Sequence, residues 1–308
     1  MPSRKSTDSR QFRLTLPATS ANLGPAFDAA ALALSLFLKV HARPADEFSI
    51  SARGRDAELC SQRENHLILT TYREVLQNEN KTVIPLALHI ENEIPIGKGC
   101  GSSAAARLAG IAMANHFGRL RWSNSRIVGE AARREHHPDN AAACWVGGLV
   151  IARMSAETEA QVANITPKGK WPLLLVVPAE SLPTEEARRV LPEHYSGVDV
   201  VTNIQNSMLL LAAFSQGRRD LLAAALTDYV HQPYRASLCP LLPALQRLTG
   251  GKGVLGVALS GAGPSVLMFL DPEIKVSGTK KRVGDHLRGQ NLSAELIETA
   301  ITSKGAGF

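Results

Sequence analysis

The sequence has few cysteines, and none of them lies at metal-binding spacing. No C-x-x-C pair occurs, and four cysteines lie far apart along the chain: Cys60, Cys100, Cys144 and Cys239. This spacing argues against a zinc site or a disulfide framework and is typical of proteins of the reduced cytosol.

Long hydrophobic segments are also missing. No run of about 18 or more apolar residues occurs, so no membrane-spanning helix is expected. Residues 1–11 are polar and charged, without the apolar stretch of a signal peptide. We therefore expect a soluble cytoplasmic protein with no membrane partner, in which residues 1–11 form a loose N-terminal arm.

A concentrated charge of one sign is missing too. Lys and Arg exceed Asp and Glu by a net charge of +6, and the excess is spread along the chain. A solvated surface is the first interpretation and a face for an anionic substrate the second, with nucleic acid a distant third. The 308 residues suffice for one large domain or two modest ones with real cores.

The most distinctive feature that is present is a run of alternate glycines. Gly97, Gly99 and Gly101 lie in Pro95-Ile-Gly-Lys-Gly-Cys-Gly-Ser-Ser-Ala-Ala105, between a predicted strand and an alanine-rich predicted helix over 104–116. Such a loop turns sharply and approaches a ligand closely. Free N–H groups at a helix start attract an anion, so we expect a phosphate here.

Two simpler interpretations of this loop stay open. It has neither the Walker A spacing nor the dinucleotide fingerprint, so on spacing alone it is equally a turn before an ordinary helix. Ser102 or Ser103 is available as a helix cap, although Ala105 and Ala106 stand where a capping box has Glu or Gln. Lys98 adds a cation.

The loop closely resembles the Pro-x-x-x-Gly-Leu-Gly-Ser-Ser-Ala-Ala motif of the GHMP kinases, and the resemblance covers roughly residues 12–270. It implies ATP as a cofactor, bound through the whole loop. Cys100 replaces Leu and is expected in apolar packing. The implied nucleotide-binding residues are Asn65, Pro95, Ile96, Gly97, Lys98, Gly99, Cys100, Gly101, Ser102, Ser103, Ala104 and Ala105. From the residues alone, Asn65 is predicted to cap a helix.

A second stretch narrows the resemblance to the homoserine kinases within that superfamily. Pro17-Ala-Thr-Ser-Ala-Asn-Leu-Gly-Pro-Ala-Phe-Asp28 matches their opening motif, which places Asn22 and Asp28 at the amino-acid substrate. Turn chemistry is the alternative, because Asn and Asp stabilise turns through their own side chains. Ala26 replaces Gly, which would cost strain if the position needed a positive φ.

A third stretch is Glu135-His-His-Pro-Asp-Asn140. Adjacent histidines make a poor tetrahedral metal site. The stretch resembles the family's Glu-Gly-His-Pro-Asp-Asn, with His136 in place of Gly. The resemblance implies that Glu135 binds Mg²⁺ together with Ser103, and that His137 and Asn140 lie at the substrate; a Ser and a Glu suit Mg²⁺, which prefers oxygen donors.

Two arginines would be surface residues by default. The family's Ala-Arg-x-x-Leu-Pro and Pro-Tyr-Arg segments match at Arg188 and Arg235, which implies that both bind the substrate carboxylate. An arginine fork pairs bidentately with a carboxylate. A further family motif, residues 260–265, is expected to pack against the glycine loop.

The order of predicted elements favours an α+β fold over a doubly wound sheet. The resemblance implies a two-domain GHMP kinase fold: a nucleotide-binding domain over 12–165 like the second domain of ribosomal protein S5, and a ferredoxin-like domain over 166–308. Residues 155–170 are interpreted as the hinge between them, and residues 220–229 as a helix. Whether the chain forms a homodimer is left open.

The implied function is transfer of the ATP γ-phosphoryl group to the side-chain hydroxyl of L-homoserine, in threonine biosynthesis. Another small alcohol as substrate, a non-catalytic nucleotide sensor and a nucleic-acid module are the alternatives. Asn140 cannot accept a proton at neutral pH, so its amide can only orient the hydroxyl. Asp139 is the rival as a base, or a helix cap. We predict catalysis without a side-chain base, with Asn140, Glu135 and Ser103 as the catalytic residues.

Overall fold

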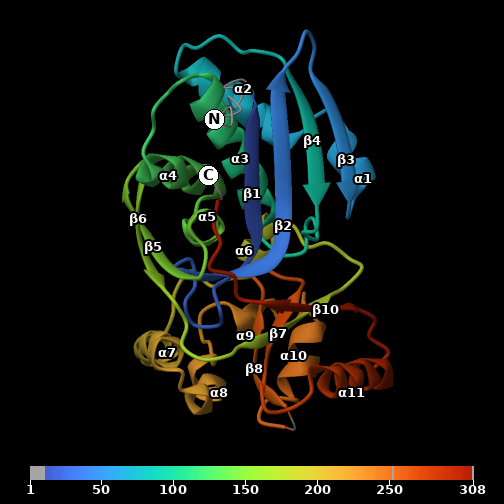
Figure 1. Ribbon diagram of the computed structural model, residues 1–308. Helices are drawn as coiled ribbons and strands as arrows, with labels where there is room; N and C mark the ends of the chain where they lie inside the picture. The colour runs from blue at the N-terminus through green and yellow to red at the C-terminus, as the bar shows by residue number, and fades with distance from the viewer. Residues whose placement is uncertain (1–10, 252, 307–308) are drawn as a thin grey trace, which may run out of the picture.

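The structure is a computed structural model that describes residues 11–251 and 253–306. Two units lie one above the other, each built on a β-sheet (Figure 1). The first sheet has the order β3-β4-β2-β5-β6, with β1 on the free edge of β2. Its strands are β1 (Phe12–Ala21), β2 (Ala30–Pro44), β3 (Ser49–Gly54), β4 (Leu86–Asn92), β5 (Leu149–Ala156) and β6 (Glu159–Ile165).

The strand β2 organises the first sheet. It pairs with β1 over the length of β1, from Phe12 opposite Ala42 to Ala21 opposite Ala31. Its two ends also pair with β4 and β5. The helices of this unit are α1 (Ala57–Ser61), α2 (Leu67–Asn78), α3 (Ser102–Phe117), α4 (Asn124–Glu135) and α5 (Asp139–Val146).

The helix α3 lies at the centre of the first unit, between β1, α2, α4 and α5 (Figure 1). Its alanines and its one glycine leave room for close packing: a Cβ at Gly110 would lie 2.6 Å from the Ile68 carbonyl oxygen of α2. Most of the helix is buried from Ala104 onward, whereas Ser102 and Ser103 at its start are half-buried. This burial fixes the direction in which the start of α3 points.

The second sheet is antiparallel, in the order β10-β7-β9-β8. Its strands are β7 (Pro172–Val177), β8 (Val254–Leu259), β9 (Val266–Leu270) and β10 (Glu295–Ala300). Alternate residues of β7 face opposite sides, and both sides are covered, so the strand is almost wholly buried. Leu175 belongs to the same core as Phe214 of α7, whereas Leu174 packs with Val283 of α11.

The helices around the second sheet are α6 (Thr184–Arg189), α7 (Gly197–Gln216), the 3-10 turn η1 (Arg219–Leu221), α8 (Leu222–Ala225), α9 (Gln232–Arg235), α10 (Leu241–Gln246) and α11 (Val276–Gly289). After β10 the chain returns to the first unit (Figure 1). There the Thr302 N–H donates to Ala33 at 3.0 Å, and the Ala306 N–H donates to Trp145 at 2.9 Å. The end of the described chain therefore ties the two units together.

Three sequence predictions are wrong. Residues 155–170 are not only a hinge, because β6 forms within them and pairs with β5. Residues 220–229 are not one helix, since only η1 and α8 form there. Asn65 does not cap α2: the cap position is His66, and Asn65 has a φ of 53°. In the part of the chain that the structure describes, no helix has the length and apolar character to cross a membrane.

The structure shows the backbone conformation at two residues that differ from the family motifs. Ala26 has no positive φ, so Ala is unstrained there. His136 has a φ of 67°, at the end of α4, and its side chain is exposed. This left-handed conformation costs a residue with a Cβ about 1–2 kcal/mol.

Replacing His136 by Gly should therefore raise the free energy of unfolding by about 1 kcal/mol, after the greater freedom of Gly in the unfolded chain is subtracted. Urea denaturation of the two proteins measures the change. His136→Ala is the matched control, since it removes the imidazole and keeps the Cβ. An equal gain in both variants would contradict the backbone explanation.

Candidate active site

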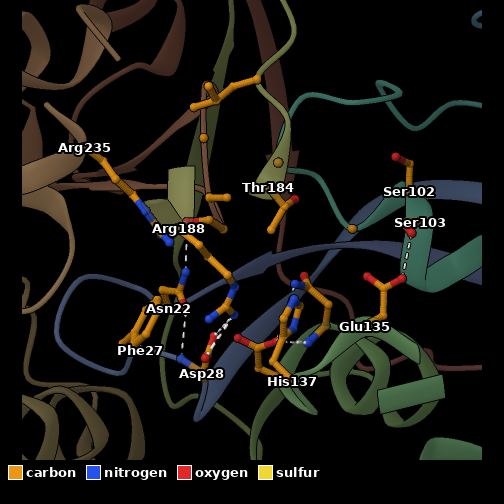
Figure 2. A pocket seen from close by; sticks show the side chains of 18 of the residues that line it. Asn22, Phe27, Asp28, Ser102, Ser103, Glu135, His137, Thr184, Arg188 and Arg235 are labelled. Atoms are coloured by element: carbon orange, nitrogen blue, oxygen red, sulfur yellow. Dashed lines mark hydrogen bonds and ion pairs between the residues drawn. The ribbon is translucent and has the colours of Figure 1, made fainter. Parts of the chain in front are cut away.

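A cavity of about 110 Å³ lies where the two units meet. The first unit contributes the glycine loop, the loop 22–28 and the start of α5, and the second contributes α6, α9 and the loop 260–265. Figure 2 shows the side chains that line it. A second cavity, of about 370 Å³ and largely apolar, lies on the other side of the glycine loop and shares Gly97, Ser102 and Ser103 with the first.

The glycine loop is in the left-handed conformation at each of its three glycines, with φ between 70° and 76°. Gly101 is the cap position of α3, and no side chain caps the helix, so neither Ser102 nor Ser103, the two available caps, has that role. The N–H groups of the first turn of α3 therefore lie at the cavity without a side-chain acceptor. This end of the helix can bind an anion.

The loop has no room for side chains at two of these glycines. A Cβ at Gly99 would lie 2.3 Å from the Ser260 carbonyl oxygen and 2.6 Å from that of Gly263. At Gly101 a Cβ would lie 1.9 Å from Thr19 Oγ1. The Ser260 hydroxyl donates to the Gly99 carbonyl at 2.8 Å. The loop 260–265 thus packs directly on the glycine loop.

Two further residues of the loop point away from the cavity. Cys100 is fully buried in the core, and burial raises the pKa of its thiol to about 12. It therefore behaves as a small apolar residue. The ammonium group of Lys98 donates to the carbonyl oxygen of Ala179 in the second unit.

Glu135 faces the start of α3. Its Oε1 accepts from the Ser103 hydroxyl at 2.6 Å and from Arg107 Nε at 2.5 Å (Figure 2 shows the serine contact). Arg107 is a residue that the sequence interpretation missed. The available signal was its position four residues after Ser103, on the same face of α3.

His137, Asp139 and Asn140 form a connected group at the start of α5. Asp139 Oδ1 lies 2.7 Å from His137 Nδ1 and accepts from the Asn140 N–H at 2.6 Å. Asn140 Oδ1 accepts from the hydroxyl of the buried Thr19 at 2.6 Å. Thr19 was also missed. It fixes the orientation of the Asn140 amide, so that the NH₂ group is the end left for the cavity.

Asp28 and Arg188 face each other across the cavity (Figure 2). Arg188 Nη2 donates to both carboxylate oxygens of Asp28, at 2.7 and 3.0 Å. Asn22 lies behind them: its Oδ1 accepts from the Asp28 N–H at 2.9 Å, and its NH₂ donates to Gly261 at 2.8 Å. Both ends of the Asn22 amide therefore hold loops together.

Arg235 is the largest fully buried side chain of the described residues. Its Nε donates to the Ala187 carbonyl at 2.8 Å, and its Nη1 lies 3.2 Å from His231 Nδ1. Burial, and after it the charge of Arg188, lower the pKa of Arg235 to about 10. The guanidinium is thus still charged at neutral pH.

The ring of Phe27 contacts both arginines. The Cζ atoms of Arg188 and Arg235 are each 5.3 Å from its centroid, a cation–π distance. Thr184, at the start of α6, also lines the cavity, as does Phe27. Neither was predicted. Asn65 lies elsewhere, at the second cavity.

Comparisons with known proteins agree with this arrangement. The model "GHMP kinases N terminal domain" matches residues 66–148, and "GHMP kinases C terminal" matches residues 210–288. A homoserine kinase of Solibacter usitatus is 45% identical over 84% of this chain and 85% of its own length. One of Deinococcus radiodurans is 34% identical over 97% of both chains.

The crystal structure of the homoserine kinase from Cytophaga hutchinsonii has the same fold, with a TM-score of 0.82 and 21% identity over 100% of this chain and 99% of that one. The fold and the two family models together identify a GHMP kinase of two domains. This confirms the prediction of a two-domain GHMP kinase fold. Within that superfamily, the chain belongs to the homoserine kinase family.

The pKa of His137 gives the site a pH-dependent contribution to stability. Burial lowers this pKa, but the hydrogen bond with Asp139 and the nearby carboxylates of Asp28 and Glu135 outweigh burial and raise it above 6.5. A raised pKa in the folded state stabilises the protein fully below 6.5 and ceases to do so as the pH rises through the folded value.

We expect the loss of unfolding free energy caused by His137→Asn to be larger at about pH 5.5 than at about pH 8.5. Chemical denaturation of both proteins at the two pH values measures the difference. The comparison with the variant cancels groups common to both proteins, such as the buried His231. A larger loss at the alkaline pH would show that the pKa of His137 is lowered in the folded protein.

Proposed function

We propose that the protein transfers the γ-phosphoryl group of ATP to the side-chain hydroxyl of L-homoserine, a step of threonine biosynthesis. The observation that carries this proposal is the charge of Arg235. Its guanidinium is buried, and no carboxylate among the described residues lies within 4.0 Å of it. A buried cation without a counter-ion is costly, so this position suits an anionic group of a ligand.

The rest of the cavity suits a zwitterion better than a sugar or an isoprenoid. Arg188 and Arg235 supply two forks for a carboxylate, and Asp28 beside them supplies an anion for an ammonium group. In the proposed complex Arg188 donates some of its N–H groups to the substrate carboxylate in place of Asp28. Asn22 acts mainly by holding Asp28 and the loop 260–265 in place.

The proposed nucleotide site is the glycine loop and the second cavity. Phosphate oxygens would accept N–H groups of residues 97–103 at the start of α3, where the helix dipole favours negative charge. The apolar second cavity, which Asn65 lines, suits a purine base. Since both cavities meet at Ser102 and Ser103, the terminal phosphate would lie at the entrance to the substrate cavity.

The donor set fits Mg²⁺ at Ser103 and Glu135. Both side chains offer an oxygen ligand. Glu135 accepts the hydrogen bonds from Ser103 and Arg107 through Oε1, so Oε2 is available to a metal ion. Bound Mg²⁺ would neutralise charge on the transferring phosphoryl group. Arg107 holds the Glu135 carboxylate in position from the side of α3.

The acceptor hydroxyl would be oriented by Asn140. Thr19 occupies the amide oxygen, and the NH₂ group, which donates one hydrogen to Asp139 Oδ1 at 3.5 Å, has a second hydrogen for the hydroxyl oxygen. Asp139 is a poor candidate for a base, because its Oδ1 already accepts N–H groups and its side chain is buried. A loose phosphoryl-transfer transition state keeps the acceptor proton bound until late, so positioning suffices.

Removal of the carboxylate contact should separate this proposal from another small-alcohol kinase. Arg235→Leu should lower kcat/KM for homoserine about tenfold to a hundredfold, because a hydrogen bond to a charged group is lost, and should leave the KM for ATP unchanged. Homoserine lactone, which has no free carboxylate, should be a poor substrate of the unchanged enzyme. A coupled assay of ADP release measures both; equal turnover of lactone and homoserine would contradict the amino-acid assignment.

The proposed mechanism separates two neighbouring residues. Asn140→Ala should lower kcat through lost orientation, whereas Asp139→Asn should act mainly on stability, because Asp139 only accepts hydrogen bonds inside the protein. Steady-state kinetics are measured on variants shown to be folded by circular dichroism. A loss of about 10³ or more in kcat for Asp139→Asn would identify that residue as the base.

A further inference from the structure

A fully buried imidazole stands between the two ends of the proposed amino-acid site. His231 Nε2 lies 2.8 Å from the carbonyl oxygen of Gly24, in the loop that carries Asp28. Its Nδ1 lies 3.2 Å from Nη1 of Arg235. One side chain thus contacts both the loop of the proposed ammonium-binding residue and the proposed carboxylate-binding residue.

The partners of the two ring nitrogens fix their protonation. The Gly24 carbonyl oxygen only accepts, as does Asp228 Oδ2 at 3.5 Å from Nε2, and a guanidinium only donates, so Nε2 carries the hydrogen and Nδ1 offers its lone pair. His231 is therefore neutral, with one defined tautomer. Burial, which lowers its pKa to about 4, agrees with a neutral ring.

The surroundings prevent the ring from turning. Both oxygens of Asp228 accept backbone N–H groups at the start of α9, including that of His231 at 3.0 Å. The imidazole stacks on Phe27, with ring centroids 5.2 Å apart. The same phenyl ring contacts the guanidinium of Arg235.

We propose that His231 is a positioning residue that holds Arg235 in place without neutralising its charge. A carboxylate at this position would pair with the guanidinium and compete with the substrate, whereas a neutral acceptor satisfies one N–H and leaves the positive charge for the ligand. Because the same ring is tied to Gly24, it also fixes the distance between Arg235 and Asp28. His231 thereby sets the spacing of carboxylate and ammonium groups that the site accepts, an inference that rests on the proposed function.

Two substitutions separate the two contacts of the ring. In His231→Asn the amide lies where Nδ1 was, so its oxygen can still accept from Arg235, while the contact with Gly24 is lost. In His231→Gln the amide reaches the place of Nε2 and can still donate to Gly24, while Nη1 of Arg235 loses the ring nitrogen and keeps only the Gly261 carbonyl, 3.5 Å away. Both variants remove the ring, which makes each the control for the other.

We expect His231→Gln to lower kcat/KM for homoserine about tenfold to a hundredfold, through KM, and His231→Asn to lower it clearly less. The kcat at saturating homoserine and the KM for ATP should change little in both. With 3-aminopropan-1-ol, which is homoserine without its carboxylate, His231→Gln and the unchanged enzyme should have the same kcat/KM, since Arg235 has no group to bind and the contact with Gly24 is kept.

Equal losses of kcat/KM for homoserine in the two variants would overturn the inference and leave a role in packing alone. So would a loss of kcat/KM in His231→Gln that is as large with 3-aminopropan-1-ol as with homoserine. An unchanged enzyme that does not phosphorylate homoserine would instead overturn the proposed function. Crystal structures of both variants decide the positioning role in that case as well: the guanidinium of Arg235 should stay against Ala187 in His231→Asn and move in His231→Gln. An unmoved guanidinium in His231→Gln would overturn the inference.

Discussion

The contact between the glycine loop and the loop 260–265 is the constraint on which the site depends. The two backbones approach so closely at Gly99 that no Cβ fits between them. Gly101 packs just as closely against the side chain of Thr19 of β1. This contact brings the start of the buried helix α3 against the second unit. The cavity, with walls from both units, exists because these backbones meet.

Charge inside the cavity is distributed unevenly, and the imbalance defines the ligand. Asp28 is paired with Arg188, and Glu135 with Arg107. Among the described residues, the hydrogen-bond partners of Arg235 are all neutral: the carbonyl oxygens of Ala187 and Gly261, and the ring of His231. One cation is therefore left for an anionic ligand at one end, and the uncapped start of α3 for another at the opposite end. An amino-acid carboxylate and a nucleotide phosphate meet these two requirements at once.

Much of the fold and the site could be predicted from the sequence, because the chemistry is concentrated in short motifs. Asp28, the glycine loop and the group from Glu135 to Asn140 each belong to a motif of at most a dozen consecutive residues, which can be recognised in the sequence. Thr19 and His231 were missed, since their partners are identified only by folding: Thr19 meets Asn140 across 121 positions. Arg107 was missed although its place four residues after Ser103 puts both on one face of α3. β6 was mistaken for a hinge because its apolar alternation, Glu-Ala-Gln-Val from residue 159, is short and only Ala160 of its residues is buried. Asn65 was mistaken for a cap because the cap preference of Asn does not distinguish it from the left-handed position just before the helix.

The most direct test of the account is a crystal structure with L-homoserine and a non-hydrolysable ATP analogue bound together. The account predicts the substrate carboxylate on Arg188 and Arg235, the hydroxyl oxygen within hydrogen-bond distance of the Asn140 NH₂ group, and the phosphates at the start of α3. Homoserine bound with its carboxylate away from Arg235, or phosphates held away from the glycine loop, would contradict it.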